Sequence, residues 1–184
     1  PETIDKISNE LTPMVATARK IKEDYPDASV VFIGPCASKK LEASRRTVRS
    51  DVDFVITFEE LAGMFEAKGL LPEAVEAHDH MNDATSAGRG YGVAGGVASA
   101  IESCIREYYP DVEVHIEHAE SLTECKKMLM LAKAGKKNGC LIEGMACPGG
   151  CVAGAGTNIP IPQAVKEVTS FKNAAEEKLP SRED

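Results

Sequence analysis

Short apolar runs alternate along this chain with longer stretches in which apolar residues recur at helical spacing. The first run is short and continuous, which is typical of a strand buried in a parallel sheet, whereas the third alternates apolar and polar residues. The runs cover residues 29–33, 53–56, 112–118 and 139–143. The helical stretches cover residues 13–24, 37–46, 57–69, 93–108, 122–134 and 163–178. In the third of these, Thr57 and Glu60 form a capping-box pattern at the start, and Leu61, Met64 and Phe65 are expected to face inward. Because a return between parallel strands usually needs a helix, the pattern predicts an α/β fold, with a four-stranded, mostly parallel sheet flanked by helices on both faces.

Two cysteine-containing turns directly follow predicted strands. Cys36 comes after the first run, and Cys147 and Cys151 lie after the fourth run, in the Gly-, Ala- and Pro-rich stretch 144–156. Small residues let the backbone wrap closely around an inorganic group, and closely spaced thiolates hold zinc or iron–sulfur clusters. Lys39 supplies a cation that stabilises a thiolate or an anionic ligand near Cys36. Since the carboxyl ends of parallel strands share one edge of a sheet, we expect the three cysteines to meet there as metal ligands.

The other candidate ligands fit a structural role better. Cys104, Cys125 and Cys140 fall on inward helical faces or in an apolar strand, so we expect them to be core residues. His78 and His80 lie in a polar stretch without evident convergent partners, which does not favour a second metal site.

The stretch Gly90–Gly95 matches the glycine spacing of dinucleotide-binding proteins and precedes a predicted helix. That motif requires an apolar strand immediately before it, and the preceding residues are polar, so we reject a nucleotide site. A helix N-terminus whose amides face an anionic ligand remains open.

Composition and net charge argue against several classes of protein. The chain has 184 residues, 43% of them hydrophobic, with a net charge of −8. This acidic balance argues against nucleic-acid binding. The sequence contains no apolar stretch of 18 residues, so it predicts no membrane-spanning helix. The six cysteines in a chain without a secretory leader indicate reduced thiols and a cytoplasmic location. The first residue is Pro rather than Met, so we expect residues 1–184 to be a segment of a longer protein.

Three stretches resemble the large-subunit catalytic domain of the iron-only ([FeFe]) hydrogenases. Pro35–Glu42 is similar to the second cluster motif of that family, and Glu143–Cys151 is similar to the third. The segments 51–57 and 86–97 also resemble family segments, in the right order. An earlier family motif, Thr-Ser-Cys-Cys-Pro, has no counterpart here. The resemblance therefore implies the second half of the catalytic domain, one lobe of a two-lobed structure.

The resemblance also implies a cofactor, the H-cluster, which is a [4Fe–4S] cluster linked to a diiron subcluster that carries CO and cyanide. Cys36, Cys147 and Cys151 would be three of the four cubane ligands, and Cys151 would bridge to the diiron unit. Around it the resemblance places Lys39 as a cyanide donor and Met145 as a diiron contact. The remaining pocket residues that it implies are Glu42, Thr12 as a proton-relay hydroxyl, Ser86 and Gly88.

The implied activity is the reversible oxidation of H₂, coupled to an iron–sulfur electron acceptor, in an anaerobic setting. The implied partners are the upstream remainder of the catalytic domain, a ferredoxin-type electron carrier and maturation proteins. With one ligand cysteine absent, we expect the isolated chain to be inactive and to lack the intact H-cluster.

Two alternatives remain open. Gly34 stands where hydrogen-producing members have Met, and Ala153, Ala155 and the pair 157–158 replace the usual ending of the third motif. These departures favour a divergent, sensory module. A non-enzymatic relative in iron–sulfur protein assembly is the other alternative, but such a relative has little reason to keep Lys39 and Met145.

Overall fold

The computed structural model describes residues 3–76 and 83–181. The chain forms two compact units. The Cys36 unit comprises Asp5–Glu76 and Gly154–Asn158, and the Cys147 unit comprises Pro1–Ile4, Ala77–Ala153 and Ile159–Asp184. Each unit is built around one pair of parallel strands, so each is described by itself.

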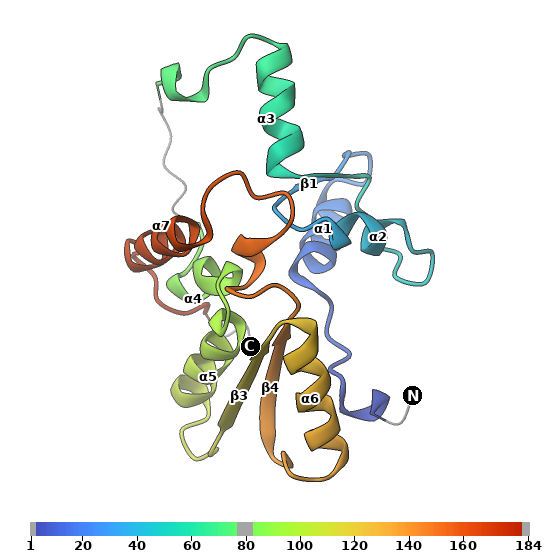
Figure 1. Cartoon of the computed structure of the whole chain (residues 1–184), viewed down its shortest axis with the longest axis vertical. Coiled ribbons are helices and arrows are strands. Elements are labelled where there is room, and N and C mark those ends of the chain that lie inside the picture. Colours follow the sequence, from blue (N-terminus) through green and yellow to red (C-terminus); the bar gives the residue numbers. More distant parts are fainter. Residues whose placement is uncertain (1–2, 77–82, 182–184) are drawn as a thin grey trace. The chain divides into compact units, whose positions relative to one another are not determined.

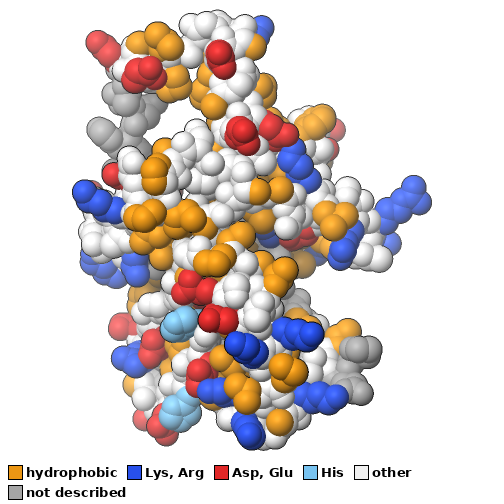
Figure 2. Space-filling view, in the orientation of Figure 1, with side chains coloured by type: hydrophobic (Ala, Val, Ile, Leu, Met, Phe, Trp, Pro, Cys, Tyr) orange, Lys and Arg blue, Asp and Glu red, His pale blue; other side chains and the backbone are white. Residues whose placement is uncertain are grey.

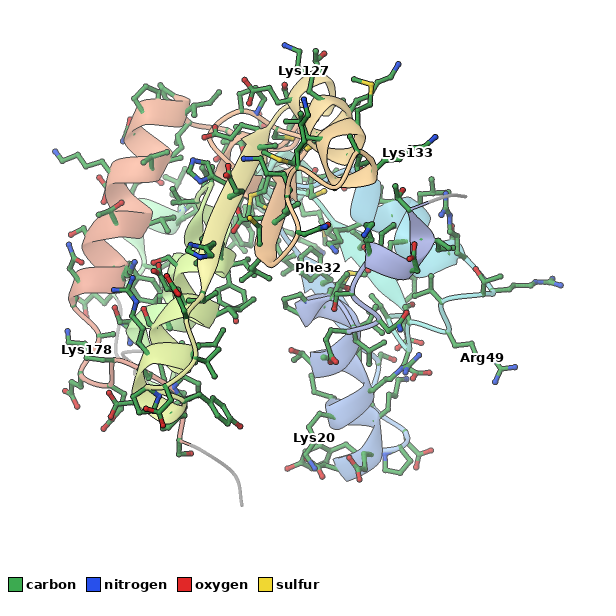
Figure 3. All side chains as sticks on the ribbon, turned by 90° about the horizontal axis from the view of Figure 1, so that it is seen from below. Lys20, Phe32, Arg49, Lys127, Lys133 and Lys178 are labelled. Atoms are coloured by element: carbon green, nitrogen blue, oxygen red, sulfur yellow. The ribbon has the colours of Figure 1, made fainter. Side chains whose placement is uncertain are left out.

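The Cys36 unit packs a helix against one face of its strand pair. Its strands β1 (Val31–Ile33) and β2 (Phe54–Ile56) are parallel, with Phe32 opposite Val55. The helices are α1 (Pro13–Asp24), α2 (Ser38–Ser44) and α3 (Phe58–Ala67), with the short 3-10 turn η2 (Pro72–Ala74) after them and η1 (Ile4–Lys6) at the start of the chain. Phe32 packs against the core on α1, and Lys20 lies on that helix (Figure 3). The core consists of Met14, Val15, Ala18, Val30 and Val52, with Phe32 and Val55 packed against it.

Helix α3 begins as the sequence predicts but buries less than expected. The Thr57 hydroxyl accepts from the Glu60 N–H, and the Glu60 carboxylate accepts from the Thr57 N–H, which completes the predicted capping box. We expected Leu61, Met64 and Phe65 to face a core. In the described part of the chain, however, α3 has no buried residue, and the Met64 side chain is 53% exposed. Leu61 and Phe65 are half-buried, so the expectation is wrong for Met64, and none of the three belongs to the core cluster formed with α1.

The Cys147 unit places helices on both sides of its strand pair. Strands β3 (His115–Glu120) and β4 (Cys140–Met145) are parallel over six residue pairs. Helices α5 (Gly96–Tyr108) and α6 (Leu122–Lys133) pack against the two strands and lie on opposite sides of them in Figure 1. The remaining elements are α4 (Ser86–Arg89), η3 (Gly90–Gly92), η4 (Cys151–Ala153) and α7 (Ile161–Asn173).

The predicted α/β class and its four parallel strands are confirmed, but the strands do not form one continuous sheet. Among the described residues β1 pairs with β2 and β3 pairs with β4, in two separate sheets. The prediction of a buried strand at 29–33 also fails, because Val31 in β1 is 44% exposed. In the paired strand β2, Phe54 is 62% exposed.

The surface of the Cys147 unit carries charges of both signs. Lysine side chains gather over α6, with acidic side chains beside them, on the face shown in Figure 2. Lys127 and Lys133 extend outward from that helix (Figure 3). Within residues 3–76 and 83–181, none of the helices combines the length and apolarity that a membrane span requires.

Candidate metal-binding site

Strand β4 leads directly into a tight turn that carries two thiols. Cys147 is half-buried and Cys151 is exposed, and all six cysteines of the chain are thiols rather than disulfides. The turn closes through a hydrogen bond from the Gly150 N–H to the Cys147 carbonyl, at 2.9 Å. Gly149 and Gly150 have φ values of 93° and 95°, which are open to glycine and strained for other residues. The sequence thus folds here into a tight turn that carries two cysteines four positions apart in the chain.

Both backbone polar groups of Gly149 in this turn are hydrogen-bonded to residues outside it. The Gly149 N–H donates to Oε2 of Glu120 at 2.7 Å, and the Gly149 carbonyl accepts from the Ala94 N–H at 3.1 Å. At Gly150 a Cβ atom would lie 2.4 Å from the Ala94 nitrogen. The turn therefore packs backbone against backbone on the glycine-rich segment before α5.

A second carboxylate holds that segment. The Gly95 N–H donates to Oε1 of Glu143 and the Ala98 N–H donates to Oε2, each at 2.7 Å. Gly95 is the N-cap of α5 and has no side chain to offer, so Glu143 on β4 provides the missing cap. The sequence left open an anionic ligand at the N-terminus of the helix that follows Gly90–Gly95. In the structure, the anion at this helix terminus is the Glu143 side chain.

In the Cys36 unit, three predicted pocket residues form one network beside the Cys36 turn. Lys39 Nζ donates to Glu42 Oε2 at 2.6 Å, and the Thr12 hydroxyl donates to Glu42 Oε1 at 2.5 Å. The Lys39 N–H donates to the Cys36 carbonyl at 3.3 Å, so this lysine sits on the first turn after the cysteine. Thr12 is the N-cap of α1, but its hydroxyl serves Glu42 rather than the helix.

The network sets the charge state of Glu42. Partial burial, the largest single effect, raises the pKa of this carboxyl, but hydrogen bonds from Lys39 and Thr12 and the charge of Lys39 together hold the pKa below its usual 4.5. The pKa values of Asp53 and Glu60 in the same unit are also lowered, Asp53 first by the Val30 N–H and Glu60 first by Lys40.

We expect acid to destabilise the Cys36 unit through these carboxylates. A group with a lowered folded pKa contributes stability above its unfolded pKa, and loses it as the pH falls through the folded value. Urea unfolding of the chain, followed by circular dichroism from pH 7 downward, should show stability falling below about pH 4.5. Glu42→Gln should start less stable at pH 7 and lose less on acidification, whereas exposed Glu10→Gln should follow the unmodified chain. An identical acid loss in Glu42→Gln would contradict the role of the network.

The last part of the glycine-rich stretch belongs to the Cys36 unit. The Gly156 N–H donates to the Pro35 carbonyl at 2.9 Å, and the Glu59 N–H donates to the Gly156 carbonyl at 3.2 Å. Gly156 is the fifth residue after Cys151, and Pro35 is the residue before Cys36. Within the Cys36 unit, Gly156 is therefore hydrogen-bonded to the residue that precedes Cys36 and to the first turn of α3.

The structure brings together some predicted site residues within each unit. Thr12, Lys39 and Glu42 interact in the Cys36 unit, and Met145 lies two residues before Cys147, with its carbonyl accepting from the Ser121 N–H at 2.9 Å. In the described part of the chain, no group of three His, Cys, Asp or Glu side chains is arranged to hold a metal ion. The meeting of Cys36 with Cys147 and Cys151, which belong to the other unit, stays a prediction.

Ser86 and Gly88 lie in α4, and their backbone amides already have partners. The Ser86 N–H donates to the Glu177 carbonyl at 2.7 Å, and the Gly88 N–H donates to the Thr85 hydroxyl at 3.2 Å. A cofactor contact by either residue stays a prediction. His78 and His80 lie outside the described residues.

Sequence reasoning missed Glu120, and it read Glu143 only as part of a motif. Both carboxylates act on backbone amides far away in the sequence, so no local spacing identifies them. The one sequence feature that could have pointed to them is their position, since each is an acidic residue in or at the end of a strand that precedes or pairs beside the cysteine motif.

Comparison with known proteins identifies the class to which this fold and these cysteine turns belong. The chain is a member of the family of the iron-only hydrogenase large subunit, C-terminal domain, which it matches over residues 1–155. It is 30% identical over 76% of its length to the periplasmic [Fe] hydrogenase large subunit of Nitratidesulfovibrio vulgaris, and 28% identical over 91% to iron hydrogenase 1 of Clostridium pasteurianum. The resemblance seen in the sequence is confirmed. The chain spans 41% and 36% of the lengths of these two relatives.

Solved structures support the fold. An apo [FeFe]-hydrogenase from Chlamydomonas reinhardtii superposes with a TM-score of 0.69 at 21% identity, covering 99% of this chain and 63% of that one. An [FeFe]-hydrogenase studied for oxygen inactivation at its H cluster 2Fe subcluster gives a TM-score of 0.64 at 20% identity, with the same coverage. At these identities the likeness concerns the fold alone.

Proposed function

We propose that this chain is part of the H-cluster domain of an iron-only hydrogenase-like protein that interconverts H₂ with protons and electrons. The observation that carries the proposal is the Cys147–Cys151 turn, in which two thiols flank two glycines with positive φ. This donor chemistry suits iron–sulfur ligation, which uses thiolates, and the absence of bulk leaves room for a large inorganic group.

In this proposal Cys147 and Cys151 hold a [4Fe–4S] cluster, and Cys36 is the third ligand. The fourth ligand lies in the part of the relatives that this chain does not span. Bound there with its diiron subcluster, the H-cluster supplies the redox chemistry of H₂.

The surrounding side chains orient the cluster and handle protons. Lys39 has three N–H donors, of which Glu42 takes one, so others are left for an anionic ligand such as cyanide. Met145 provides an apolar contact to the diiron unit. The hydrogen bond from the Thr12 hydroxyl to Glu42 gives a proton a short path between these two groups. Ser86 and Gly88 complete the proposed pocket.

The proposed activity also requires protein components other than this chain. We propose a ferredoxin-type electron carrier, maturation proteins that build the cluster, and an anaerobic cytoplasmic setting. One of the relatives is named for the periplasm, so location requires its own measurement by cell fractionation.

A sensory role is the second candidate, and one contact favours it. At Gly34, where hydrogen-producing members have Met, a Cβ atom would lie 2.9 Å from the ring of Phe32. The ring therefore occupies the space that a larger residue 34 would need. Retained CO and cyanide infrared bands with slow H₂ turnover would favour a sensor over a catalyst.

Replacement of the cysteines tests the proposed ligands. In the full-length protein, matured anaerobically, Cys36→Ser, Cys147→Ser and Cys151→Ser should each lose most of the iron and the visible absorbance, because a thiolate ligand is removed. Iron per chain and the infrared bands of CO and cyanide provide the measurement.

Cys104→Ser and Cys125→Ser are the matched controls, because these thiols lie on helices α5 and α6 rather than in the turns. They should keep the iron while costing about 1–3 kcal/mol of stability. Iron retained in Cys147→Ser but lost in Cys125→Ser would refute the assignment.

A further inference from the structure

We propose that Glu120 is a positioning residue for the metal-binding turn between Cys147 and Cys151. Its carboxylate fixes the peptide between Pro148 and Gly149 through the Gly149 N–H, so that the two sulfur atoms keep the spacing required for a shared cluster. The inference rests on the proposed function, since it concerns the turn that is proposed to bind iron.

The backbone of Glu120 is itself firmly placed. Glu120 is the last residue of β3 and lies opposite Met145 at the end of β4. Its N–H donates to Oε2 of Glu124 at 3.1 Å. The next residue, Ser121, has a φ of 83° and donates its N–H to the Met145 carbonyl at 2.9 Å. The carboxylate therefore extends from a site fixed on both sides.

The turn needs an external acceptor at this position. Pro148 has no N–H, and the Gly150 N–H is already bonded within the turn to the Cys147 carbonyl. Glu120 accepts the Gly149 N–H at 2.7 Å, within the usual range of a charge-assisted hydrogen bond.

Two consecutive glycines would otherwise leave this turn with wide conformational freedom. Glu120 holds the Gly149 N–H, in the peptide between Pro148 and Gly149, and Ala94 holds the Gly149 carbonyl, in the peptide between Gly149 and Gly150, so the peptide planes on both sides of Gly149 are fixed. Glu120 is thus expected to lower the conformational cost of cluster binding at Cys147 and Cys151, although it does not touch the metal.

Two variants and a control separate this role from a general effect on folding. Glu120→Ala removes the acceptor, whereas Glu120→Gln keeps one side-chain oxygen that can accept from Gly149. Glu113→Ala is the control, because Glu113 is an exposed carboxylate close to the same strand, with a side chain 85% exposed. Circular dichroism checks that each variant is folded.

The first readout needs no metal. In this chain, the Gly149 amide should exchange with deuterium about tenfold or more faster in Glu120→Ala, as expected when a hydrogen bond to a charged group is lost. Glu120→Gln should stay within about threefold of the unmodified chain if its oxygen replaces the carboxylate. Glu113→Ala should not change this exchange rate.

The second readout is iron release in the full-length protein. On addition of excess EDTA, Glu120→Ala should lose iron several-fold faster than the unmodified protein, and Glu120→Gln should largely restore the slow rate. Equal release rates in Glu120→Ala and the unmodified protein would overturn the proposal, as would unchanged exchange of the Gly149 amide. If the unmodified full-length protein binds no iron, the proposed function fails, and exchange at Gly149 still decides whether Glu120 holds the turn.

Discussion

Gly150→Ala should destabilise the Cys147 unit by about 3–5 kcal/mol, because two penalties combine at this position. The φ of 95° is strained for any residue that carries a Cβ. The added Cβ would also lie 2.4 Å from the Ala94 nitrogen and 2.7 Å from the Val93 carbonyl carbon. These neighbours are backbone atoms and cannot rotate away, so the turn must separate from the segment before α5.

Gly63→Ala is the matched control for this change. No heavy atom lies within 4 Å of the position of its Cβ, and Gly63 lies within helix α3. Alanine there should be neutral or stabilising by up to about 1 kcal/mol. Urea unfolding together with amide exchange of β4 measures both variants. If Gly150→Ala were as stable as Gly63→Ala, the close backbone packing of the cysteine turn would be wrong.

The sequence was sufficient for features that depend on neighbouring residues. The apolar runs located all four strands, and the capping box at Thr57 and Glu60 located the start of α3. Cys36 and Cys147 were expected beyond strand ends, and they lie after β1 and β4. These predictions succeed because hydrophobic period and helix caps act over a few residues.

Pairing between strands could not be obtained in the same way. A run such as 53–56 shows that a strand forms, but not which partner it takes or whether a helix covers its second face. Phe54 is 62% exposed although its run is apolar, because the packing that would cover it is not a local property. The single four-stranded sheet was therefore the simplest prediction and not the observed arrangement.

In the candidate site, too, the sequence identified residues with local signals and missed those whose partners are distant in the sequence. The cysteines and Lys39 were found by motif and resemblance, and the Lys39–Glu42 pair has the i, i+3 spacing of neighbours on a helix. The carboxylates of Glu120 and Glu143 were not assigned their roles, because their partners are 29 to 48 residues away. Buried backbone amides must be satisfied, but the sequence does not show which side chain does so.

Glu143→Ala should produce the second large effect, a loss of about 2–3 kcal/mol in the Cys147 unit. Two backbone N–H groups, of Gly95 and Ala98, lose their acceptor at once, and each now has a carboxylate oxygen at 2.7 Å. Because Gly95 is the N-cap and lacks a side chain, no other group on α5 can replace the missing cap. The first turn of α5 should fray, and the segment that holds Gly149 should loosen with it.

Glu143→Gln sharpens the test, because it keeps the size of the side chain but replaces one acceptor oxygen with an NH₂ donor. One of the two amides then faces another donor, so Gln should recover only part of the stability lost in Glu143→Ala. Glu113→Ala again serves as the exposed control. Amide exchange at Ala98 and Gly149, measured beside urea unfolding, locates the effect. Full stability in Glu143→Ala, with both amides still protected, would show that solvent or another group caps α5 equally well and that β4 does not anchor the cysteine turn through this helix.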